Sequence, residues 1–421
     1  MGAVTRRNPT YQQDRGQPRK HRPDYWLLIL TIALLAVGII VVFSISPALE
    51  VEKGVDGNHY VMRQLVAVGL GLAVFTAAAL FPFQKLRTFA IPLLILAGIA
   101  TLVALITPVN ADYPAHRWIR VGSFSFQSVE LLKVAMILWL AGFLTYRMQN
   151  GSMGDFHKTL KPLAIGLVAA GFIVAGLQSD LGSFGVMVAM VGVMSFVAGL
   201  PMKRILLIGA IILIGVVIAI SSTPYRRDRL AAYLHPEQDC LVSGYQACQA
   251  LIAVGSGGMI GLGLGRSVQA YGYLPEAEND SIFAIYAEKF GFLGITVLLG
   301  LFAAFFTRIK RIAERAPDDY TRLVVVGILV WLSTQAVINI GAMIGLLPLK
   351  GITLPLVSYG GSSVLLVMAA LGIVFQISRY TSFGIPEASS SPINNGAGRY
   401  ENSGDRRRVR GSHYPNSGRR T

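Results

Sequence analysis

The sequence predicts an all-α protein that crosses a membrane many times, that is, a polytopic membrane protein. Apolar residues make up 53% of the 421 residues, and charged residues make up only 14%. Apolar runs long enough to span a bilayer recur along the chain. The net charge of +15 does not call for a nucleic-acid partner, because cytoplasmic loops of membrane proteins collect Lys and Arg. We therefore expect a membrane protein that binds no nucleic acid.

Ten apolar runs are predicted as transmembrane helices, and they form one domain over residues 25–380. The polar, basic segments 1–24 and 381–421 are expected to be disordered tails. Most of the 37 Lys and Arg residues fall on the side of the first tail. This bias predicts that both termini are cytoplasmic and that a large extracytoplasmic loop connects helices 7 and 8. The predicted spans are 25–46, 61–82, 88–108, 129–147, 162–178, 183–200, 204–222, 282–306, 321–345 and 360–379.

The unusual segments of the chain all fall on the predicted outer side. The inner loops are short and basic, whereas the outer segments carry acids, glycines, prolines and isolated basic residues. Function is therefore expected on the extracytoplasmic face. The segments concerned are 110–127, 178–182, 223–281 and 348–363.

An acidic stretch, 271–290, lies where the chain is about to enter lipid. Ionisable groups at a membrane boundary are costly unless they are solvated, paired or used. Pro275 interrupts the backbone just before a predicted helix, and Asp280 stands at its start. Glu288 follows by eight residues, about 12 Å along a helix, which exceeds the ~6.5–9.5 Å that separates paired carboxylates in inverting glycosidases. Asp280 is thus the candidate for chemistry, with Glu276 beside it, and Glu288 the candidate for a structural or orienting role.

Two glycine-rich segments have two interpretations each. Gly257 and Gly258 belong to a run over 255–265 that can either line up amides on an anion or pack closely against another backbone. The segment at the start of the last helix can bind an anion through amides and hydroxyls, although small residues at helix contacts are more common. Its candidate residues are Ser358, Gly360, Gly361 and Ser362.

Three further charged residues on the outer side are candidates for substrate contact. Arg117 is either an interfacial anchor or a group that attracts a pyrophosphate. Asp180 is either an N-cap residue or part of a site. Lys350 stands on the outer side against the positive-inside trend, where an ordinary interfacial lysine is the alternative.

Two residue pairs complete the local interpretation. Glu130 and Lys133 are three residues apart on a predicted helix and are expected to pair. Cys240 and Cys248 either form a disulfide on the oxidising side or remain two thiols. The sequence offers no cluster with metal-ligand spacing, so no metal site is predicted.

Nine motifs, in this order, resemble the SEDS family of cell-wall glycosyltransferases, the FtsW and RodA proteins. The G-L-G-x-S and Y-L-P-E-A forms are more similar to the FtsW division branch. The resemblance covers about residues 25–380. The motifs are R-W-I at 117–119, D-L-G at 180–182, G-Y-Q at 244–246, G-S-G-G at 255–258, G-L-G-x-S at 263–267, Y-L-P-E-A at 273–277, D-x-I-F-A-I at 280–285, K-G-I-T-L-P at 350–355 and S-Y-G-G-S-S at 358–363.

The resemblance implies polymerisation of lipid II into β-1,4-linked glycan strands at the outer membrane face. It places the key aspartate of the family on Asp280, its second acid on Asp180 and its basic loop residue on Lys350. It implies a class B penicillin-binding protein transpeptidase and other divisome proteins as partners, in the bacterial cytoplasmic (inner) membrane at the division septum. The sequence departs from the family pattern at Q-S-V-E (127–130), E-N-D-S (278–281) and Glu288-Lys289.

The leading hypothesis is a peptidoglycan glycosyltransferase with Asp280 as general base. No cofactor is assigned, and charge stabilisation can come from Arg117, Lys350, backbone amides or a divalent cation, Mg²⁺ or Mn²⁺. The rival hypotheses are a lipid II flippase, a non-catalytic scaffold and a RodA-type elongation polymerase. For the leading hypothesis we expect a lateral groove with Asp280 at its floor and Lys350 across from it, within about one Debye length, ~10 Å.

Overall fold

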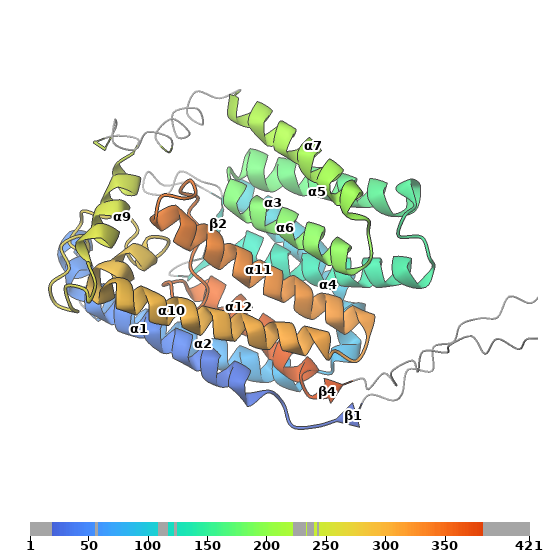
Figure 1. Ribbon diagram of the computed structural model, residues 1–421, viewed down its shortest axis with the longest axis horizontal. Helices are drawn as coiled ribbons and strands as arrows, with labels where there is room; N and C mark the ends of the chain where they lie inside the picture. The colour runs from blue at the N-terminus through green and yellow to red at the C-terminus, as the bar shows by residue number, and fades with distance from the viewer. Residues whose placement is uncertain are drawn as a thin grey trace, which may run out of the picture. The chain divides into compact units, whose positions relative to one another are not determined.

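Helices make up almost all of the structure (Figure 1), a computed structural model that describes residues 19–54, 58–107, 117–121, 124–221, 240–241 and 244–381, together with Tyr233. Four short strands of the described chain pair, β1 (Arg19–Lys20) with β4 (Tyr380–Thr381) and β2 (Trp118–Val121) with β3 (Phe124–Gln127). The helices are α1 (Tyr25–Lys53), α2 (His59–Leu80), α3 (Leu86–Ile106), α4 (Ser128–Gln149), α5 (Lys161–Ala170), α6 (Leu181–Val197), α7 (Met202–Ser221), α9 (Tyr245–Ser256), α10 (Ile282–Glu314), α11 (Asp319–Met343) and α12 (Gly361–Ile377). A 3-10 turn, η1 (Phe83–Lys85), precedes α3, and π-helical segments η2 (Phe156–Leu160) and η3 (Gly171–Leu177) flank α5.

Seven helical segments of the described chain are long and apolar enough to cross a membrane. They are 25–50, 59–80, 83–106, 128–149, 156–177, 282–314 and 319–343. The three remaining predicted spans coincide with α6, α7 and α12, of which α6 and α12 are shorter apolar helices. The prediction of a largely helical, polytopic membrane protein is confirmed, whereas the number of ten crossings stays a prediction.

The two ends of the helical domain lie together. Strand β1 (Arg19–Lys20) pairs antiparallel with β4 (Tyr380–Thr381). Asp24 caps α1 by accepting hydrogen bonds from the amides of Trp26 and Leu27, and its carboxylate lies 3.7 Å from Arg308 near the end of α10. Residues 19–24 therefore belong to the folded domain, which begins before the predicted boundary at 25. Segments 1–18 and 382–421 of the two predicted tails lie outside the described residues.

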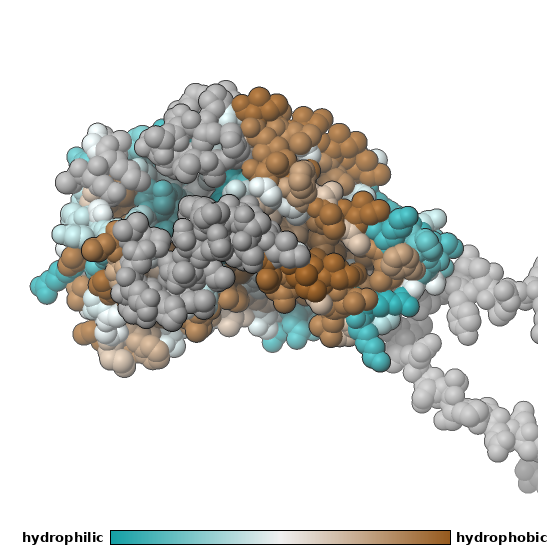
Figure 2. Space-filling model, turned by 90° about the horizontal axis from the view of Figure 1, so that it is seen from above, coloured by the Kyte–Doolittle hydropathy of each residue, from teal (hydrophilic) through white to brown (hydrophobic). Residues whose placement is uncertain are grey.

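Helices α4 and α11 form the centre of the domain. In their most apolar stretches 72% and 67% of the residues are buried, against 22% in α2 and α3. Helix α2 packs along α12 through glycines, since a Cβ on Gly372 would lie 2.4 Å from the carbonyl oxygen of Phe75. Small residues bring membrane helices this close. Figure 2 shows broad apolar areas on the visible surface, as expected of a surface in contact with lipid.

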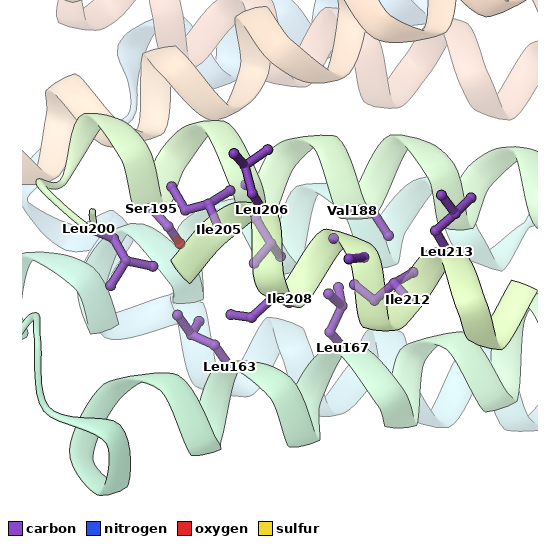
Figure 3. A pocket seen from close by; sticks show the side chains of 14 residues that line it. Leu163, Leu167, Val188, Ser195, Leu200, Ile205, Leu206, Ile208, Ile212 and Leu213 are labelled. Carbon is purple, nitrogen blue, oxygen red and sulfur yellow. The ribbon is translucent and has the colours of Figure 1, made fainter. Parts of the chain in front are cut away.

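A cavity of about 300 Å³ lies among α5, α6 and α7 (Figure 3). Aliphatic side chains line it, among them Leu163, Val188 and Ile212, and Ser195 is the polar exception. Its described lining contains no acidic or basic side chain, and so none of the groups that proton transfer and charge stabilisation in glycosyl transfer need. The site described next lies elsewhere, at the start of α10.

Candidate active site

Asp280 lies near the end of a run of turns that leads through Ser281 into α10. The carbonyl oxygen of Glu276, a residue with a positive φ of 52°, accepts hydrogen bonds from the amides of Asn279 and Ser281. Ser281 Oγ donates to the carbonyl of Pro275 at 2.8 Å and accepts from Gln246 Nε2 of α9 at 3.1 Å. The structural role predicted for Pro275 stays a prediction, since its backbone carbonyl makes this contact. The turn is held from inside and from α9, which fixes the backbone of Asp280.

The Asp280 carboxylate has unusual surroundings. Its Oδ1 atom is buried and has no hydrogen-bond partner in the described part of the chain. Its Oδ2 atom faces Gly351, whose φ of 61° is in the region that favours glycine. A Cβ at Gly351 would lie 3.6 Å from Asp280 Oδ2 and 3.4 Å from Arg117 Nη1. The missing side chain leaves free the place that the carboxylate and the guanidinium both border.

These surroundings raise the pKa of Asp280 to about 7. Burial is the main cause, and the nearby carboxylates of Glu276 and Glu278 add to it. Arg117 acts in the opposite direction, because a positive neighbour favours the charged carboxylate. A carboxyl group with a pKa near neutrality can both accept and release a proton under physiological conditions, which a carboxylate at its ordinary pKa of ~4 does poorly.

Arg117 is fixed by a break between two helical segments. The wide turns of η3 end at Leu177, and Ser179 follows with a positive φ of 55°. Arg117 donates from Nη2 to the carbonyl of Ser179 at 2.6 Å and from Nε to that of Gln178 at 3.3 Å. Since two carbonyls hold two of its donors, the guanidinium is oriented while Nη1 remains next to Gly351.

Asp180 has the contacts of an N-cap residue. Its Oδ1 accepts from the amide of Ser183 at 3.0 Å and its Oδ2 from the Ser183 hydroxyl at 2.8 Å, and the side chain is buried. Of the two interpretations that the sequence allowed, these contacts match the N-cap. Asp180 acts on the site indirectly. It caps the start of α6 immediately after Ser179, whose carbonyl holds Arg117. Direct substrate contact by Asp180 stays a prediction without support from these contacts.

The loop before α12 packs against both Asp280 and α6. A Cβ on Gly182 would lie 2.9 Å from Lys350 Cβ and 2.6 Å from Ile352 Cδ1, so the first turn of α6 leaves no room for a side chain there. Lys350 is half-buried and precedes Gly351 directly. The four segments around 117, 180, 280 and 350 therefore meet. The groove and the distance between Lys350 and Asp280 stay predictions.

Serines of this loop make internal contacts. Ser358 Oγ accepts from the amide of Leu354 at 2.7 Å and donates to the carbonyl of Asn279 at 2.6 Å. Ser362 Oγ, in the first turn of α12, accepts from the amide of Gln127 at 3.3 Å. Their hydroxyls position the loop, whereas Gly361 borders open space. Substrate contact by Ser358, Ser362, Gly360 and Gly361 stays a prediction.

Glu288 and Lys289 anchor the glycine-rich segment. Glu288 accepts hydrogen bonds from the Ser267 hydroxyl, from the amide of Val268 at 2.8 Å and from that of Gln269 at 3.2 Å. Lys289 donates to the carbonyls of Leu264 at 2.8 Å and Ser44 at 3.4 Å. The orienting role predicted for Glu288 agrees with these contacts. The lysine that stands in place of a second acid has a structural task of its own.

Close backbone packing accounts for the glycines at 257 and 261. A Cβ on Gly257 would lie 2.2 Å from the carbonyl oxygen of Ala287, and one on Gly261 2.1 Å from that of Lys289. At Gly291, with a φ of 63°, α10 is broken where this segment crosses it. Gly258 adopts a positive φ of 52°. Anion binding by this run stays a prediction, because Gly257 and Gly261 pack against α10 whereas a Cβ on Gly258 would meet nothing within 4 Å.

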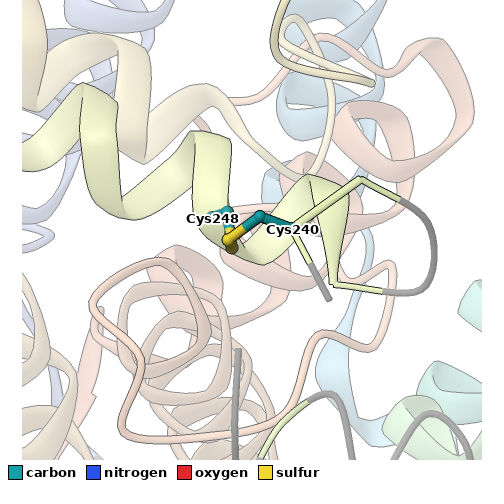
Figure 4. The surroundings of a disulfide bond; sticks show 2 residues. All are labelled: Cys240 and Cys248. Atoms are coloured by element: carbon teal, nitrogen blue, oxygen red, sulfur yellow. A yellow bond between two sulfur atoms is a disulfide. The ribbon is translucent and has the colours of Figure 1, made fainter. Parts of the chain in front are cut away.

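The structure also describes the two residue pairs singled out in the sequence. Cys240 and Cys248 form a disulfide at the start of α9 (Figure 4), which decides between the two alternatives left open by the sequence. Lys133 Nζ lies 2.6 Å from Glu130 Oε1, as predicted, and also donates to Gln335 Oε1 at 2.8 Å. No group of three or more His, Cys, Asp and Glu side chains within the described ranges is arranged to hold a metal ion.

The family model described as "Cell cycle protein", which covers FtsW, RodA and SpoVE, matches residues 25–383. The chain belongs to the FtsW/RodA/SpoVE family. A family member, "Stage V sporulation protein E" of Bacillus subtilis (strain 168), is 40% identical over 366 residues, 87% of this chain and 99% of that protein. The "Probable peptidoglycan glycosyltransferase FtsW" of Coxiella burnetii is 36% identical over 368 residues, 85% and 96% of the two chains. The resemblance to the SEDS family is thereby confirmed.

Solved structures of the FtsW/RodA/SpoVE family share the fold. A chain from a structure described as a peptidoglycan synthase complex that coordinates polymerization and crosslinking has a TM-score of 0.70 and 28% identity, covering 85% of this chain and 98% of its own. The rod shape determining protein RodA of Thermus thermophilus has a TM-score of 0.62 and 27% identity, covering 85% and 97%.

Two side-chain amides of α11 that hold the Asp280 site were not predicted from the sequence. Asn339 of α11 donates to the carbonyls of Asp280 and Ile352, both at 2.7 Å. Gln335, one turn earlier, donates to Thr353. A signal was present, because polar side chains within an apolar span are rare and tend to be functional.

Proposed function

We propose that this chain, a peptidoglycan glycosyltransferase of the FtsW/RodA/SpoVE family, uses Asp280 as the general base that joins lipid II units into glycan strands. The observation that carries the proposal is the Asp280 carboxylate itself, which is partly buried, lacks a partner for Oδ1 and has its pKa raised to about 7. A buried acid that no structural contact uses is a candidate for proton transfer.

The reaction needs one proton acceptor. The oxygen of the acceptor sugar's 4-hydroxyl attacks the anomeric carbon of the donor and forms the new C–O bond, while its proton passes to Asp280. The bond between the anomeric carbon and the pyrophosphate oxygen breaks, and the lipid pyrophosphate leaves with the electron pair. Direct displacement inverts the anomeric carbon and yields a β-1,4 linkage. Pyrophosphate is already a good leaving group, so no general acid is required.

Charge on the leaving pyrophosphate is stabilised by the basic groups beside Asp280. Arg117 is oriented by two carbonyls and presents Nη1 toward the place that Gly351 leaves free. Lys350 comes from the adjacent loop. Oriented charges of this kind stabilise a developing anion without reorganising during the reaction. A divalent cation, Mg²⁺ or Mn²⁺, would add positive charge next to the pyrophosphate and stabilise it in the same way.

The orientation in the membrane follows from the same proposal. The chain crosses the bacterial cytoplasmic membrane ten times with both termini inside, and the pairing of β1 with β4 supports a common side for the two ends. Asp280 then faces the outer side, where the lipid II sugars are in water and its tail is in the bilayer. Several relatives carry the FtsW name, which supports a role at the division septum within the divisome.

A partner for crosslinking is part of the proposal. The matched synthase complex coordinates polymerization with crosslinking, and the described serines beside Asp280, Ser281 and Ser358, donate to backbone carbonyls. A class B penicillin-binding protein supplies that second activity.

The test is polymerisation of lipid II by the purified protein together with its transpeptidase partner. Wild-type protein is expected to produce glycan strands, and Asp280→Asn to lose roughly 10²- to 10⁴-fold in rate, which is the usual contribution of a general base. Glu314→Gln, at an exposed acid near the other end of α10, is the control and keeps full activity. Full activity of Asp280→Asn would refute the assignment. Headgroup translocation in vesicles without polymerisation would favour a flippase instead.

A further inference from the structure

Asn339 is a polar residue inside one of the most buried helices of the protein. It lies in α11, and only 2% of its surface is exposed. Placing an amide in such surroundings costs free energy unless hydrogen bonds compensate for the loss of water. Its contacts therefore show what the residue does.

One amide nitrogen of Asn339 joins two separate segments. Nδ2 donates to the carbonyl of Asp280 at 2.7 Å and to the carbonyl of Ile352, also at 2.7 Å. An amide NH₂ group has two hydrogens, so both donors are used. Asp280 lies near the end of a run of turns, and Ile352 lies in an irregular loop. The two segments also meet where Ser358 Oγ and the amide of Tyr359 donate to the carbonyls of Asn279 and Glu278. Asn339 adds the contact that joins them at Asp280 itself, from α11.

The two carbonyls belong to the residues that position the Asp280 carboxylate and the space beside Arg117. The Asp280 carboxylate belongs to the same residue as the first carbonyl. Gly351, which borders both Asp280 Oδ2 and Arg117 Nη1, precedes the second. If the two segments separate, the distance between the carboxylate and the guanidinium changes. A displacement of about 1 Å in an active site can cost 10²-fold in rate.

The side-chain oxygen of Asn339 shows that the residue acts through its NH₂ group. Oδ1 is buried and has no hydrogen-bond partner within the described residues. A buried acceptor without a partner lowers stability, and a leucine of similar size would avoid that cost. The two donated bonds are thus the function that the side chain serves.

Gln335 provides a natural comparison, because it holds the same loop without contacting Asp280. Its Nε2 donates to the carbonyl and the hydroxyl of Thr353 at 3.1 Å and 3.3 Å. Its Oε1 accepts from Lys133 and Trp331, both at 2.8 Å. Loss of Gln335 removes the contacts of α11 with Thr353 but leaves both Ile352 and the Asp280 turn held by Asn339.

We propose that Asn339 is a positioning residue that sets the place of the Asp280 carboxylate relative to Arg117 by clamping the Asp280 turn to the loop at Gly351 and Ile352. The proposal rests on the proposed function, in which Asp280 is the base. It extends that function to a residue on a different helix that touches no substrate.

The experiment measures kcat, KM and the pH dependence of kcat/KM for lipid II polymerisation by the complex with its partner. Asn339→Leu is expected to lower kcat roughly 10²-fold with KM for lipid II nearly unchanged. Asn339→Asp keeps the shape but places a carboxylate near Asp280. The charged groups that face Asp280 are Glu276, Glu278 and Arg117, with Lys350 in the adjacent loop, so one more negative charge shifts the acid limb of the profile to higher pH.

Two controls separate positioning from general damage. Gln335→Leu is expected to lower kcat less and to leave the acid limb in place. Gln376→Leu removes a buried amide of α12 whose Oε1 also lacks a partner, and it is expected to leave both kcat and the pH profile unchanged. An equal loss of kcat in Gln335→Leu and Asn339→Leu would overturn the proposal, since the effect would then belong to the loop as a whole.

The outcomes are distinguishable from failure of the proposed function. A folded Asn339→Leu protein with kcat within twofold of wild type refutes the positioning role. If Asn339→Leu does not fold, Asn339→Asp decides, and an unchanged acid limb refutes the role. If wild-type protein does not polymerise lipid II, or Asp280→Asn retains activity, the proposed function itself is refuted, whatever the Asn339 variants do.

Discussion

Asp280 and Glu288 are acids eight residues apart at the start of the same helix, and their surroundings are opposite. Glu288 accepts three hydrogen bonds, from the Ser267 hydroxyl and from the amides of Val268 and Gln269. Asp280 Oδ1 is buried without a partner in the described part of the chain, and burial, together with two nearby acids, raises the pKa of Asp280. The hydrogen-bonding capacity of the Glu288 carboxylate is used by the fold. The Asp280 carboxylate has a buried oxygen without a partner among the described residues, which lowers the stability of the folded state.

This difference separates structure from chemistry. Buried polar groups in proteins are nearly always hydrogen-bonded, so an exception needs a reason. The carboxylate oxygens of Glu288 accept hydrogen bonds from the loop at 267–269 and stabilise it. Asp280 retains a free acceptor beside an oriented guanidinium, which is what a base that meets substrate requires. Three predictions test this contrast.

The largest expected effect on stability is at Glu288. Glu288→Ala removes three hydrogen bonds to a charged group and leaves their donors unpaired, which we expect to lower the free energy of unfolding by roughly 5 kcal/mol. Thermal melting of the purified protein in detergent measures the change. Glu50→Ala, at an exposed acid near the end of α1, is the matched control. A melting temperature of Glu288→Ala equal to that of the control would contradict the structural role.

The second prediction is that a substitution of Asp280 raises the stability of the protein, whereas that of Glu288 lowers it. A raised carboxyl pKa means that the folded state favours the protonated form, so stability falls as pH rises from about 4 toward about 7. Asp280→Asn removes the buried charge and is expected to stabilise the protein by up to about 4 kcal/mol at pH 8, since each pKa unit corresponds to about 1.4 kcal/mol. The gain in melting temperature should be smaller at pH 5. A loss of stability at pH 8 would show that the charged carboxylate is satisfied after all.

The smallest of the three effects is expected at the disulfide. Cys240 and Cys248 close a short loop at the start of α9, whose Gln246 donates to Ser281 beside Asp280. Replacing both cysteines by serine is expected to cost about 2–3 kcal/mol from the entropy of loop closure. Hydrogen exchange should increase first in α9. Unchanged exchange in α9 would place the stabilisation elsewhere.

The sequence predicted the helices well because a span is a local property. A run such as 321–345 is long, apolar and uninterrupted, and the structure has α11 there. The break of α10 at Gly291 was not predicted, since its cause is the glycine-rich segment that crosses it at Gly261. Packing between segments that are distant in the sequence produces no hydrophobic periodicity in either segment, so it cannot be predicted from the local pattern.

The candidate site was predicted in part for the same reason. Asp280 and Glu288 could be assigned different roles from their spacing and their place at a membrane boundary. Asp180 could not be decided, because an Asp before a helix is an N-cap or a site residue according to contacts that the sequence does not contain. Asn339 was missed because its two acceptors come from segments 59 and 13 residues away.

The central claim is that Asp280 acts as a base with a pKa near neutrality, and the pH dependence of kcat/KM for lipid II polymerisation tests it most directly. This ratio reports the titration of essential groups in the free enzyme. We expect activity to fall about tenfold per pH unit below about 7, with Glu288→Gln, if folded, retaining the same limb. An acid limb near ~4, the value of an ordinary aspartate, would contradict the account.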